Sequence, residues 1–367
     1  MQQVNNRLAS LDFLRGFDMF WIIGGSSLAG SLITFLGWPS LEPIAKHLEH
    51  AEWIGFTAYD LIFPLFIFIC GVAMPNSFDK YLALRQKRNL YFKIIRRTLI
   101  LILLGWFYNG LTTDLDFANA RYLSVLGHIG LAYFWASIIV INLRPLYQAV
   151  CAVGILVFYF LLMKFVPVPG CGSGVLTPDG NFASFIDRLI IPGQLLWGSG
   201  DPEGILMTLP ASVLAIAGAL TGNLLKNQKI NAYHKCFIVT CVGIACLCAG
   251  LYWSIYFPII KKLWTSSFIL YAAGWSLLLL AIFYLIVDIW GVRKIFFPFM
   301  LIGLNPITIY IGARCIIDFS YMTNFIFGGL MRLVGTNLSS IVFNLSLLIC
   351  EIIFLYILYH KKIFIKI

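Results

Sequence analysis

Residues 57–77 read TAYDLIFPLFIFICGVAMPNS, an apolar run in which Asp60 is the only charged residue. A run of about 20 apolar residues is long enough to cross the roughly 30 Å hydrocarbon core of a bilayer as an α-helix. Similar runs recur along the chain, which has 367 residues, of which 60% are hydrophobic and only 11% are charged. The sequence therefore predicts an all-α, multi-pass membrane protein.

The apolar runs predict about ten transmembrane helices in one bundle. Their approximate bounds are 17–36, 57–77, 94–111, 123–142, 147–166, 205–225, 235–257, 266–288, 296–317 and 340–359. Residues 321–335 are apolar but short, so a re-entrant or interfacial helix is the alternative there. We expect residues 1–367 to form one domain, and the chain shows no internal repeat of the kind found in many carriers.

Basic residues predict the orientation of the helices. The loop after the second predicted helix has one acidic residue, Asp79, and carries Lys80, Arg85, Lys87, Arg88, Lys93, Arg96 and Arg97. Because Lys and Arg accumulate in short cytoplasmic loops, we place this loop and both termini in the cytoplasm. His50 and the long extracytoplasmic loop at about 167–204 then face the other side. The net charge of +10 thus reflects topology and contact with anionic lipid of the bilayer, and it does not indicate nucleic acid.

One histidine lies at the mouth of the second predicted helix. His50 begins the run HAEWIGFTAYD, which contains Glu52 and ends at Asp60. Histidine exchanges protons near neutral pH, so it can act as a base or as a nucleophile, and a carboxylate can fix its tautomer. The alternatives are a solvated interfacial histidine and, for Asp60, a charge at a helix N-terminus. We expect His50, Glu52 and Asp60 to be catalytic.

Two charged residues lie at the cytoplasmic end of the first predicted helix. If this helix begins near Ser10, Asp12 and Arg15 are at positions i and i+3 on one face. They could contact an anionic cofactor that enters from the cytoplasm. A helix cap and an arginine that only sets the topology are the alternative.

Polar residues also occur within or beside later helices. Arg121 is at the outer end of the fourth predicted helix, and His128 is two turns inside it, where ionisable residues usually face a cavity or a partner. Asn305-Pro306 interrupts the ninth helix, and Tyr310 follows about one turn later. Such a break often lines a cavity. The alternatives are an arginine that extends to the interface and a simple kink.

The nine cysteines indicate neither a disulfide framework nor a metal site. Most lie in or at the ends of apolar runs, where a thiol packs as a small hydrophobic group. No Cys-x-x-Cys pair accompanies a histidine at the spacing of a zinc site. We therefore expect no metal.

Taken in order, these motifs resemble the heparan-α-glucosaminide N-acetyltransferase family and its bacterial relatives among the transmembrane acyltransferases. The resemblance extends over nearly the whole chain and rests on residues 7–16, His50 to Gly55 with Asp60 to Pro64, Arg121 with Val125-Leu126, Pro167 to Cys171, Ile186 to Leu189, Asp201 to Ile205, Leu263-Trp264, Asn305, Tyr310 and Tyr359 to Phe364. It implies that the whole chain is one transmembrane acyltransferase domain. The active histidine of the family corresponds to His50.

The resemblance also implies a reaction. Acetyl-CoA in the cytoplasm would supply the acetyl group, and the amino group of a glucosamine-type sugar on the extracytoplasmic side would receive it, with His50 as general base or acetyl acceptor. Candidates for contact with CoA are Asp12, Arg15, Arg96, Arg97 and Arg293. Candidates for contact with the sugar are Arg121, His128, Asp187, Asp201, Glu203, Asn305 and Tyr310.

Two positions depart from the family pattern. His128 is found where the family usually has arginine, and Gly24 to Ser27 are found where it usually has an asparagine. Both changes would alter the acceptor pocket, so the sugar is left open. An O-acetyltransferase of a cell-envelope sugar and an amino-sugar carrier without chemistry remain alternatives. Because no further domain precedes the first motif, we expect a bacterial cytoplasmic membrane, and the resemblance alone implies a homodimer.

Overall fold

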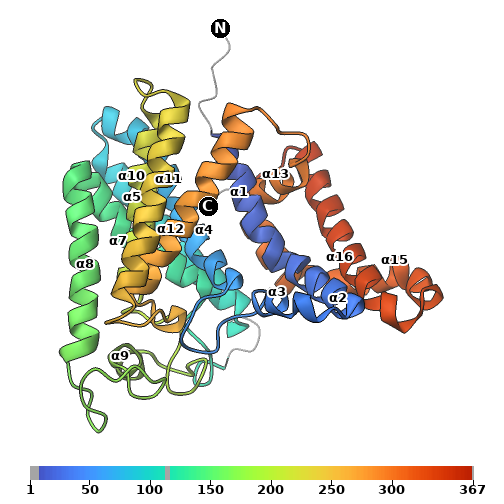
Figure 1. The fold of residues 1–367 in the computed structure, drawn as a ribbon, viewed down its shortest axis with the longest axis horizontal. Helices are drawn as coiled ribbons and strands as arrows, with labels where there is room; N and C mark the ends of the chain where they lie inside the picture. Colours follow the sequence, from blue (N-terminus) through green and yellow to red (C-terminus); the bar gives the residue numbers. More distant parts are fainter. Residues whose placement is uncertain (1–7, 112–115, 366–367) are drawn as a thin grey trace. The chain divides into compact units, whose positions relative to one another are not determined.

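The computed structural model describes residues 8–111 and 116–365 (Figure 1). Arg7 in the first motif and Lys366 in the C-terminal tail therefore lie outside the described residues. The only β pairing within the described part is an isolated bridge between Val168 and Gly172. The predicted all-α class is confirmed. The described residues form two compact units: unit 1 contains residues 8–50, 57–62 and 279–365, and unit 2 contains residues 51–56, 63–111 and 116–278.

The helices of unit 2 pack closely through small residues. In order they are α4 (Ile62–Ala83), α5 (Lys87–Tyr108), α7 (Val125–Asn142), α8 (Pro145–Phe165), α9 (Phe182–Ile190), α10 (Thr208–Lys226), α11 (Ala232–Trp253) and most of α12 (Ser266–Phe283). A Cβ on Gly71 would lie 2.1 Å from the carbonyl oxygen of Ala215, and one on Gly218 would lie 2.2 Å from that of Phe68. Glycine is therefore needed where α4 and α10 meet, as is common between membrane helices.

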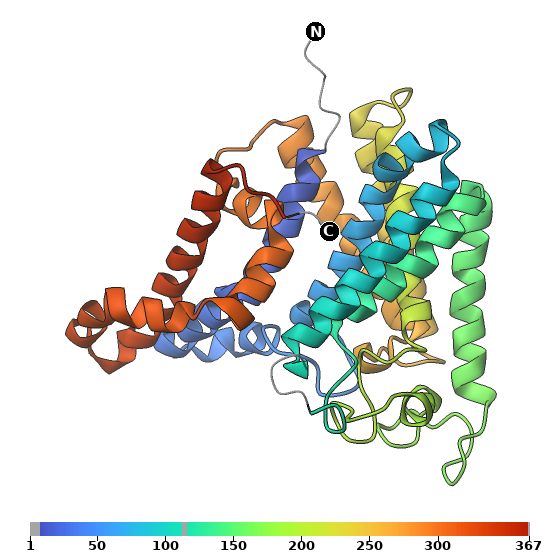
Figure 2. The same ribbon diagram turned by 180° about the vertical axis from the view of Figure 1, so that it is seen from behind.

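Unit 1 combines the two ends of the described chain. Its helices are α1 (Ala9–Phe20), α2 (Ser26–Leu36), α3 (Glu42–Lys46), α13 (Phe297–Leu304), α14 (Pro306–Ile311), α15 (Phe319–Leu333) and α16 (Gly335–His360). A π-helical segment, Trp21–Gly25, joins α1 to α2, and Gly24 within it has a φ of 153°. Figures 1 and 2 show α13 beside α1 and α15 beside α16 from both sides.

Membrane-length helices occupy most of the predicted spans. Eight helices in the described residues are long and apolar enough to cross a bilayer, or nine if α13 and the helix after Asn305, bent by 78°, count as one broken span. The segment predicted at 94–111 is the end of α5, a helix that does not qualify because five cations, Lys87, Arg88, Lys93, Arg96 and Arg97, fill its first half. The chain is thus a multi-pass membrane protein with eight or nine such spans, fewer than the ten predicted. The orientation of the termini stays a prediction.

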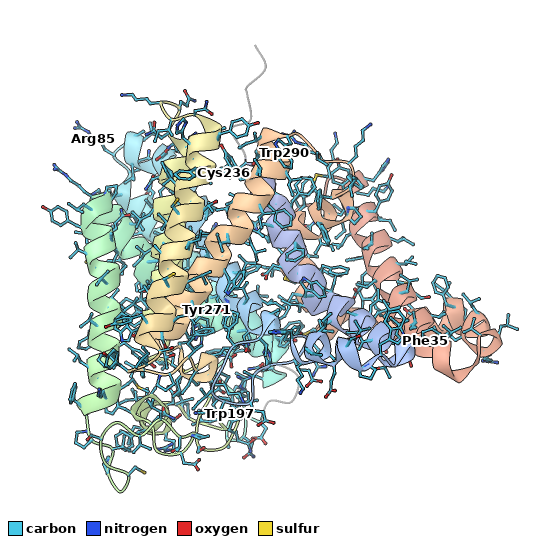
Figure 3. All side chains as sticks on the ribbon, in the orientation of Figure 1. Phe35, Arg85, Trp197, Cys236, Tyr271 and Trp290 are labelled. Atoms are coloured by element: carbon cyan, nitrogen blue, oxygen red, sulfur yellow. The ribbon has the colours of Figure 1, made fainter. Side chains whose placement is uncertain are left out.

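Large apolar side chains extend outward from these helices (Figure 3). The exposed fraction is 47% for Phe35 and 60% for Trp290. Such residues are numerous on the surface, whereas soluble monomers seldom expose extended apolar patches. Contact with lipid explains this surface.

Two glycines let α1 and α13 touch backbone to backbone. A Cβ on Gly16 would lie 1.6 Å from the carbonyl oxygen of Phe299, and a Cβ on Gly303 would lie 1.8 Å from that of Asp12. No side chain can be accommodated at those distances without moving a helix. This contact therefore fixes the position of α1 against α13 in unit 1.

We expect Gly303→Ala to lower the thermal unfolding midpoint of the purified protein in detergent. The added methyl group must separate α1 from α13, and forced overpacking of this kind costs about 1–3 kcal/mol. Gly30→Ala in α2 is the matched control, because nothing lies within 4 Å of its added Cβ. An unfolding midpoint for Gly303→Ala equal to that of the control would contradict the close contact.

Candidate functional site

The turn before α4 is built around one buried carboxylate. Oδ2 of Asp60 accepts a hydrogen bond from the backbone N–H of Thr57 (3.1 Å). This bond, together with one from the N–H of Asp60 to the side chain of Thr57, forms a capping box at the start of a 3₁₀ turn, Ala58–Leu61, that leads into α4. Asp60 is fully buried, so its position is set by the fold.

The second oxygen of the same carboxylate binds His50. Nδ1 of His50 lies 2.8 Å from Oδ1 of Asp60, and the imidazole packs against the ring of Tyr59 at 4.8 Å between centroids. The side chain of His50 is 50% exposed, whereas that of Asp60 is 1% exposed. When Nδ1 donates to a carboxylate, a neutral imidazole presents a lone pair at Nε2. This arrangement can take up a proton or attack a carbonyl carbon.

The loop that carries His50 is tied to the same turn. The hydroxyl of Thr57 donates to the carbonyl of Glu49 (2.6 Å), and the N–H of Tyr59 donates to the carbonyl of His47 (3.1 Å). Nδ1 of His47 accepts from the N–H of Ala58 at 3.3 Å. Neither His47 nor Thr57 is predicted from the sequence to belong to the site, although the spacing of Thr57 and Asp60 is that of a capping box.

Glu52 belongs to unit 2, and its side chain is exposed. Its backbone carbonyl accepts a hydrogen bond from Nζ of Lys262 (2.6 Å), whose ammonium lies over the rings of Trp53 and Trp197. The carboxylate that contacts His50 is therefore that of Asp60. A catalytic role for Glu52 stays a prediction.

A second polar group, in unit 2, surrounds Arg121. Its guanidinium donates two hydrogen bonds of 2.7 Å to Asp201 and also contacts the carboxylate of Glu203. Burial alone would raise the pKa of Asp201, but the hydrogen bonds from Arg121 outweigh it and lower that pKa. Burial, reinforced by Asp201, raises the pKa of Glu203. The cluster thus joins one ionised carboxylate to a carboxyl group that favours its protonated form.

His128 lies beside this cluster, fully buried in α7. Its ring stacks on Trp264 at 4.6 Å and meets the edge of Phe63 at 5.3 Å. Nε1 of Trp264 donates to the carbonyl of Pro202 (2.9 Å), so the stacked indole is held by the loop that contains Asp201 and Glu203.

Asp187, on α9, supports the same loop. Its Oδ1 accepts from the N–H of Ile205 (3.0 Å), and a Cβ on Gly204 would lie 2.1 Å from its Oδ2. Burial raises the pKa of Asp187 to about 7, although the hydrogen bond from Ile205 acts in the opposite sense. The structure therefore brings four predicted residues of unit 2, Arg121, His128, Asp201 and Glu203, into one cluster, with Asp187 at the base of its loop.

The predicted cofactor residues lie in several places. In unit 1, Arg15 contacts Asp12 (3.3 Å) and the carbonyl of Gly303 (3.3 Å), and the exposed Arg293 lies 4.0 Å from Asp288. In unit 2, Arg96 is exposed on α5, whereas the guanidinium of Arg97 covers the ring of Tyr133 at 4.4 Å. Their contact with CoA stays a prediction.

Asn305 holds the C-terminal tail. Its amide nitrogen donates to the carbonyl of Ile363 (3.0 Å), and its oxygen accepts from the N–H of Ile365 (3.0 Å). Tyr310 is half-buried on α14. Binding of substrate by either residue stays a prediction. No group of three or more His, Cys, Asp or Glu side chains suited to a metal ion occurs among residues 8–111 and 116–365.

We expect the stability of the wild type to fall as pH rises through about 7, because folding favours the protonated form of Asp187. A carboxyl group whose pKa is raised on folding contributes stability at low pH that is lost above the folded pKa. Asp187→Asn keeps an oxygen for the N–H of Ile205, so its unfolding midpoint should vary less with pH. Thermal unfolding between about pH 5 and pH 8 measures this difference. The prediction would be contradicted if the unfolding midpoints of the wild type and of Asp187→Asn changed equally with pH.

Comparisons with known proteins agree with these motifs. Residues 7–143 match the family model described as a domain of unknown function, DUF5009. The chain is 26% identical over 426 residues to the heparan-alpha-glucosaminide N-acetyltransferase of Mus musculus, covering 100% of this chain and 62% of that protein. It is 26% identical over 421 residues to the protein of the same name from Homo sapiens, covering 98% and 60%.

The chain therefore spans about three fifths of the length of these curated relatives. The aligned part runs through both units and includes the His50–Asp60 pair and the Arg121 cluster. The resemblance indicated by the motifs is confirmed: over nearly its whole length the chain is similar to the heparan-alpha-glucosaminide N-acetyltransferases of Mus musculus and Homo sapiens.

Proposed function

We propose that the protein is a transmembrane N-acetyltransferase. It moves the acetyl group of cytoplasmic acetyl-CoA to the amino group of a glucosamine-type sugar on the extracytoplasmic side. The observation that carries this proposal is the hydrogen bond between the exposed His50 and the buried Asp60. The name shared by the two curated relatives supports both the reaction and the sugar class. A bacterial cytoplasmic membrane stays an expectation from the sequence, and a homodimer rests on the resemblance alone.

In the route that we favour, His50 acts as a general base. Nε2 removes a proton from the sugar ammonium, and the free amine attacks the thioester carbonyl. The new C–N bond forms, the C–S bond breaks, and the second proton of the amine passes to the CoA thiolate. Asp60 holds the imidazole in the tautomer that can accept a proton, and it stabilises the imidazolium that results. In this route acetyl-CoA and the sugar must be bound at the same time.

The second route uses His50 as a nucleophile. Nε2 attacks the thioester, the C–S bond breaks, and CoA leaves as the thiolate, which takes a proton from solvent. The free sugar amine then attacks the acetyl group, the bond from the acetyl carbon to Nε2 breaks, and the amine loses a proton to solvent as the imidazole is restored. The same hydrogen bond to Asp60 would activate either route. A single histidine with one carboxylate partner suffices for the base, which is why the direct route is preferred.

The Arg121 cluster is the proposed support of the sugar site. Arg121 already contacts both Asp201 and Glu203, so the neighbouring His128 is the remaining ionisable group of the cluster that could contact an amino sugar. Fully polar clusters of this kind are costly to assemble unless they serve a ligand or fix a loop. The arginines named above remain the candidates for the phosphates of CoA, since guanidinium groups bind phosphate well.

We expect His50→Ala to abolish transfer of label from radiolabelled acetyl-CoA to glucosamine by the purified protein in detergent. General base catalysis contributes about 10²- to 10⁴-fold, so the residual rate should fall by that factor or more. His234→Ala, at an exposed position on α11, is the matched control and should keep full activity. Protein incubated with labelled acetyl-CoA alone should stay unlabelled by the direct route and become acetylated by the second.

The same assay separates the alternatives. A product whose label is released by mild base would identify an ester and an O-acetyltransferase. Uptake of amino sugar by proteoliposomes without acetyl-CoA, unaffected by His50→Ala, would identify a carrier. Failure of the wild type to bind acetyl-CoA would overturn the proposal.

Asp60→Asn should lower kcat by about 10²- to 10⁴-fold and leave KM for acetyl-CoA nearly unchanged. The asparagine oxygen can still cap Thr57, but its NH₂ group would face Nδ1 and favour the imidazole tautomer with a proton on Nε2. Steady-state kinetics test this effect, and Glu52→Gln serves as the comparison. A larger loss for Glu52→Gln than for Asp60→Asn would reassign the partner of His50.

A further inference from the structure

Two carboxyl groups are buried inside candidate membrane spans of unit 1. Asp18 on α1 is 1% exposed, and Glu351 on α16 is 2% exposed. Neither oxygen of Asp18 has a hydrogen-bond partner among the described residues, and neither has Oε2 of Glu351. An ionisable residue at such a position is costly and usually marks a function. The proposed acetyl transfer uses neither of them.

The register between α16 and the segments that follow α1 places Glu351 about one helical turn from the level of Asp18. The side chain of Asn344 donates to the carbonyl of Ser27 (3.2 Å), and Leu348 lies against Gly24. The two segments therefore run antiparallel. The next turn of α16, which carries Glu351, comes level with Trp21, which follows Asp18 by three residues.

Neighbouring charges do not neutralise Asp18. On α1, Asp12 and Arg15 contact each other. In the π-helical segment Tyr284–Ile289, Asp288 accepts hydrogen bonds from the N–H groups of Ala9 and Ser10 at 3.2 Å, at the far end of α1. No residue of α13 is charged. On the next elements, the ionisable groups are the half-buried Tyr310 of α14, the exposed Arg314 and the half-buried Cys315.

The surroundings of Glu351 are equally apolar. The other ionisable side chains of α16 are Cys350, Tyr356, Tyr359 and His360, and α2 has none. The charged residue of α15 is Arg332, in its last turn. No ion pair joins Asp18 or Glu351 to another described residue. An isolated carboxylate is strongly disfavoured in such a setting, whereas a neutral carboxylic acid is tolerated.

The backbone next to Asp18 is irregular. The π-helical segment begins at Trp21, three residues after Asp18, and Gly24 leaves helical geometry with a φ of 153°. Single π-helical turns are frequent at functional sites in helices. A break of this kind allows local adjustment of α1 beside the carboxyl group.

We propose that Asp18 and Glu351 form a proton-binding site within the membrane. The ligand is a proton held on each carboxyl group. A metal cation would need several oxygen ligands, and no suitable group of side chains occurs in the described residues. The site is separate from the His50–Asp60 pair and does not depend on the acetyl acceptor.

The test is covalent labelling of the purified full chain by dicyclohexylcarbodiimide, an apolar reagent that reaches carboxyl groups within micelles or membranes. The acid proton moves to a nitrogen of the reagent, the carboxyl oxygen bonds to its central carbon, and the adduct rearranges to a stable N-acylurea with no atom lost. Mass spectrometry of peptides locates it. We expect adducts on Asp18 and Glu351, and none on Asp288, whose two oxygens accept hydrogen bonds from the N–H groups of Ala9 and Ser10.

Asp18→Asn should lose the adduct at position 18 and retain the one on Glu351, and Glu351→Gln should do the reverse. A water-soluble carbodiimide should label neither buried residue. Absence of an adduct on Asp18 in the wild type, or equal reaction with the water-soluble reagent, would overturn the proposal. Labelling requires no catalysis, so the result is independent of whether the acetyl transfer is found.

Discussion

The double use of the Asp60 carboxylate is the constraint on which the candidate active site depends. One oxygen caps the turn that starts α4, and the other holds His50. Because the carboxylate is buried, both bonds are protected from water and are stronger than they would be on the surface. The start of a helix therefore fixes the tautomer and the direction of an exposed imidazole. Although His50 lies in a loop, its side chain is therefore held in position as firmly as one on a rigid helix.

A second buried carboxylate organises unit 2 in a similar manner. Asp201 accepts two hydrogen bonds from Arg121 and one each from the N–H groups of Leu196 and Glu203. These bonds close the loop on itself and bring Glu203 next to Arg121. The indole of Trp264 then binds the loop and stacks on His128. A long, polar segment of chain is thus ordered by a few buried side chains.

Much of the fold could be predicted because a bilayer imposes length and polarity on every span. The predicted apolar runs and the observed membrane-length helices agree at most positions. The exception is α5, because the cations in its first half leave too short an apolar stretch to cross a bilayer. Contacts between residues far apart in the chain could not be predicted from the sequence. The positive charge of Arg121 has many possible acidic partners in the sequence, and only folding selects Asp201, 80 residues away. Likewise, nothing in the sequence shows that the amide of Asn305 binds the tail.

By itself, the sequence determined that this chain is an all-α membrane protein and that His50, near Asp60, is the residue to consider for chemistry. Both conclusions follow from local properties, namely runs of apolar residues and charged groups close together in the chain. The tertiary structure alone decided which carboxylate holds His50, which acids surround Arg121, and that Asp18 and Glu351 are buried without partners. The physical reason is that burial and hydrogen bonding depend on packing between helices, where glycines such as Gly16 and Gly303 set the spacing.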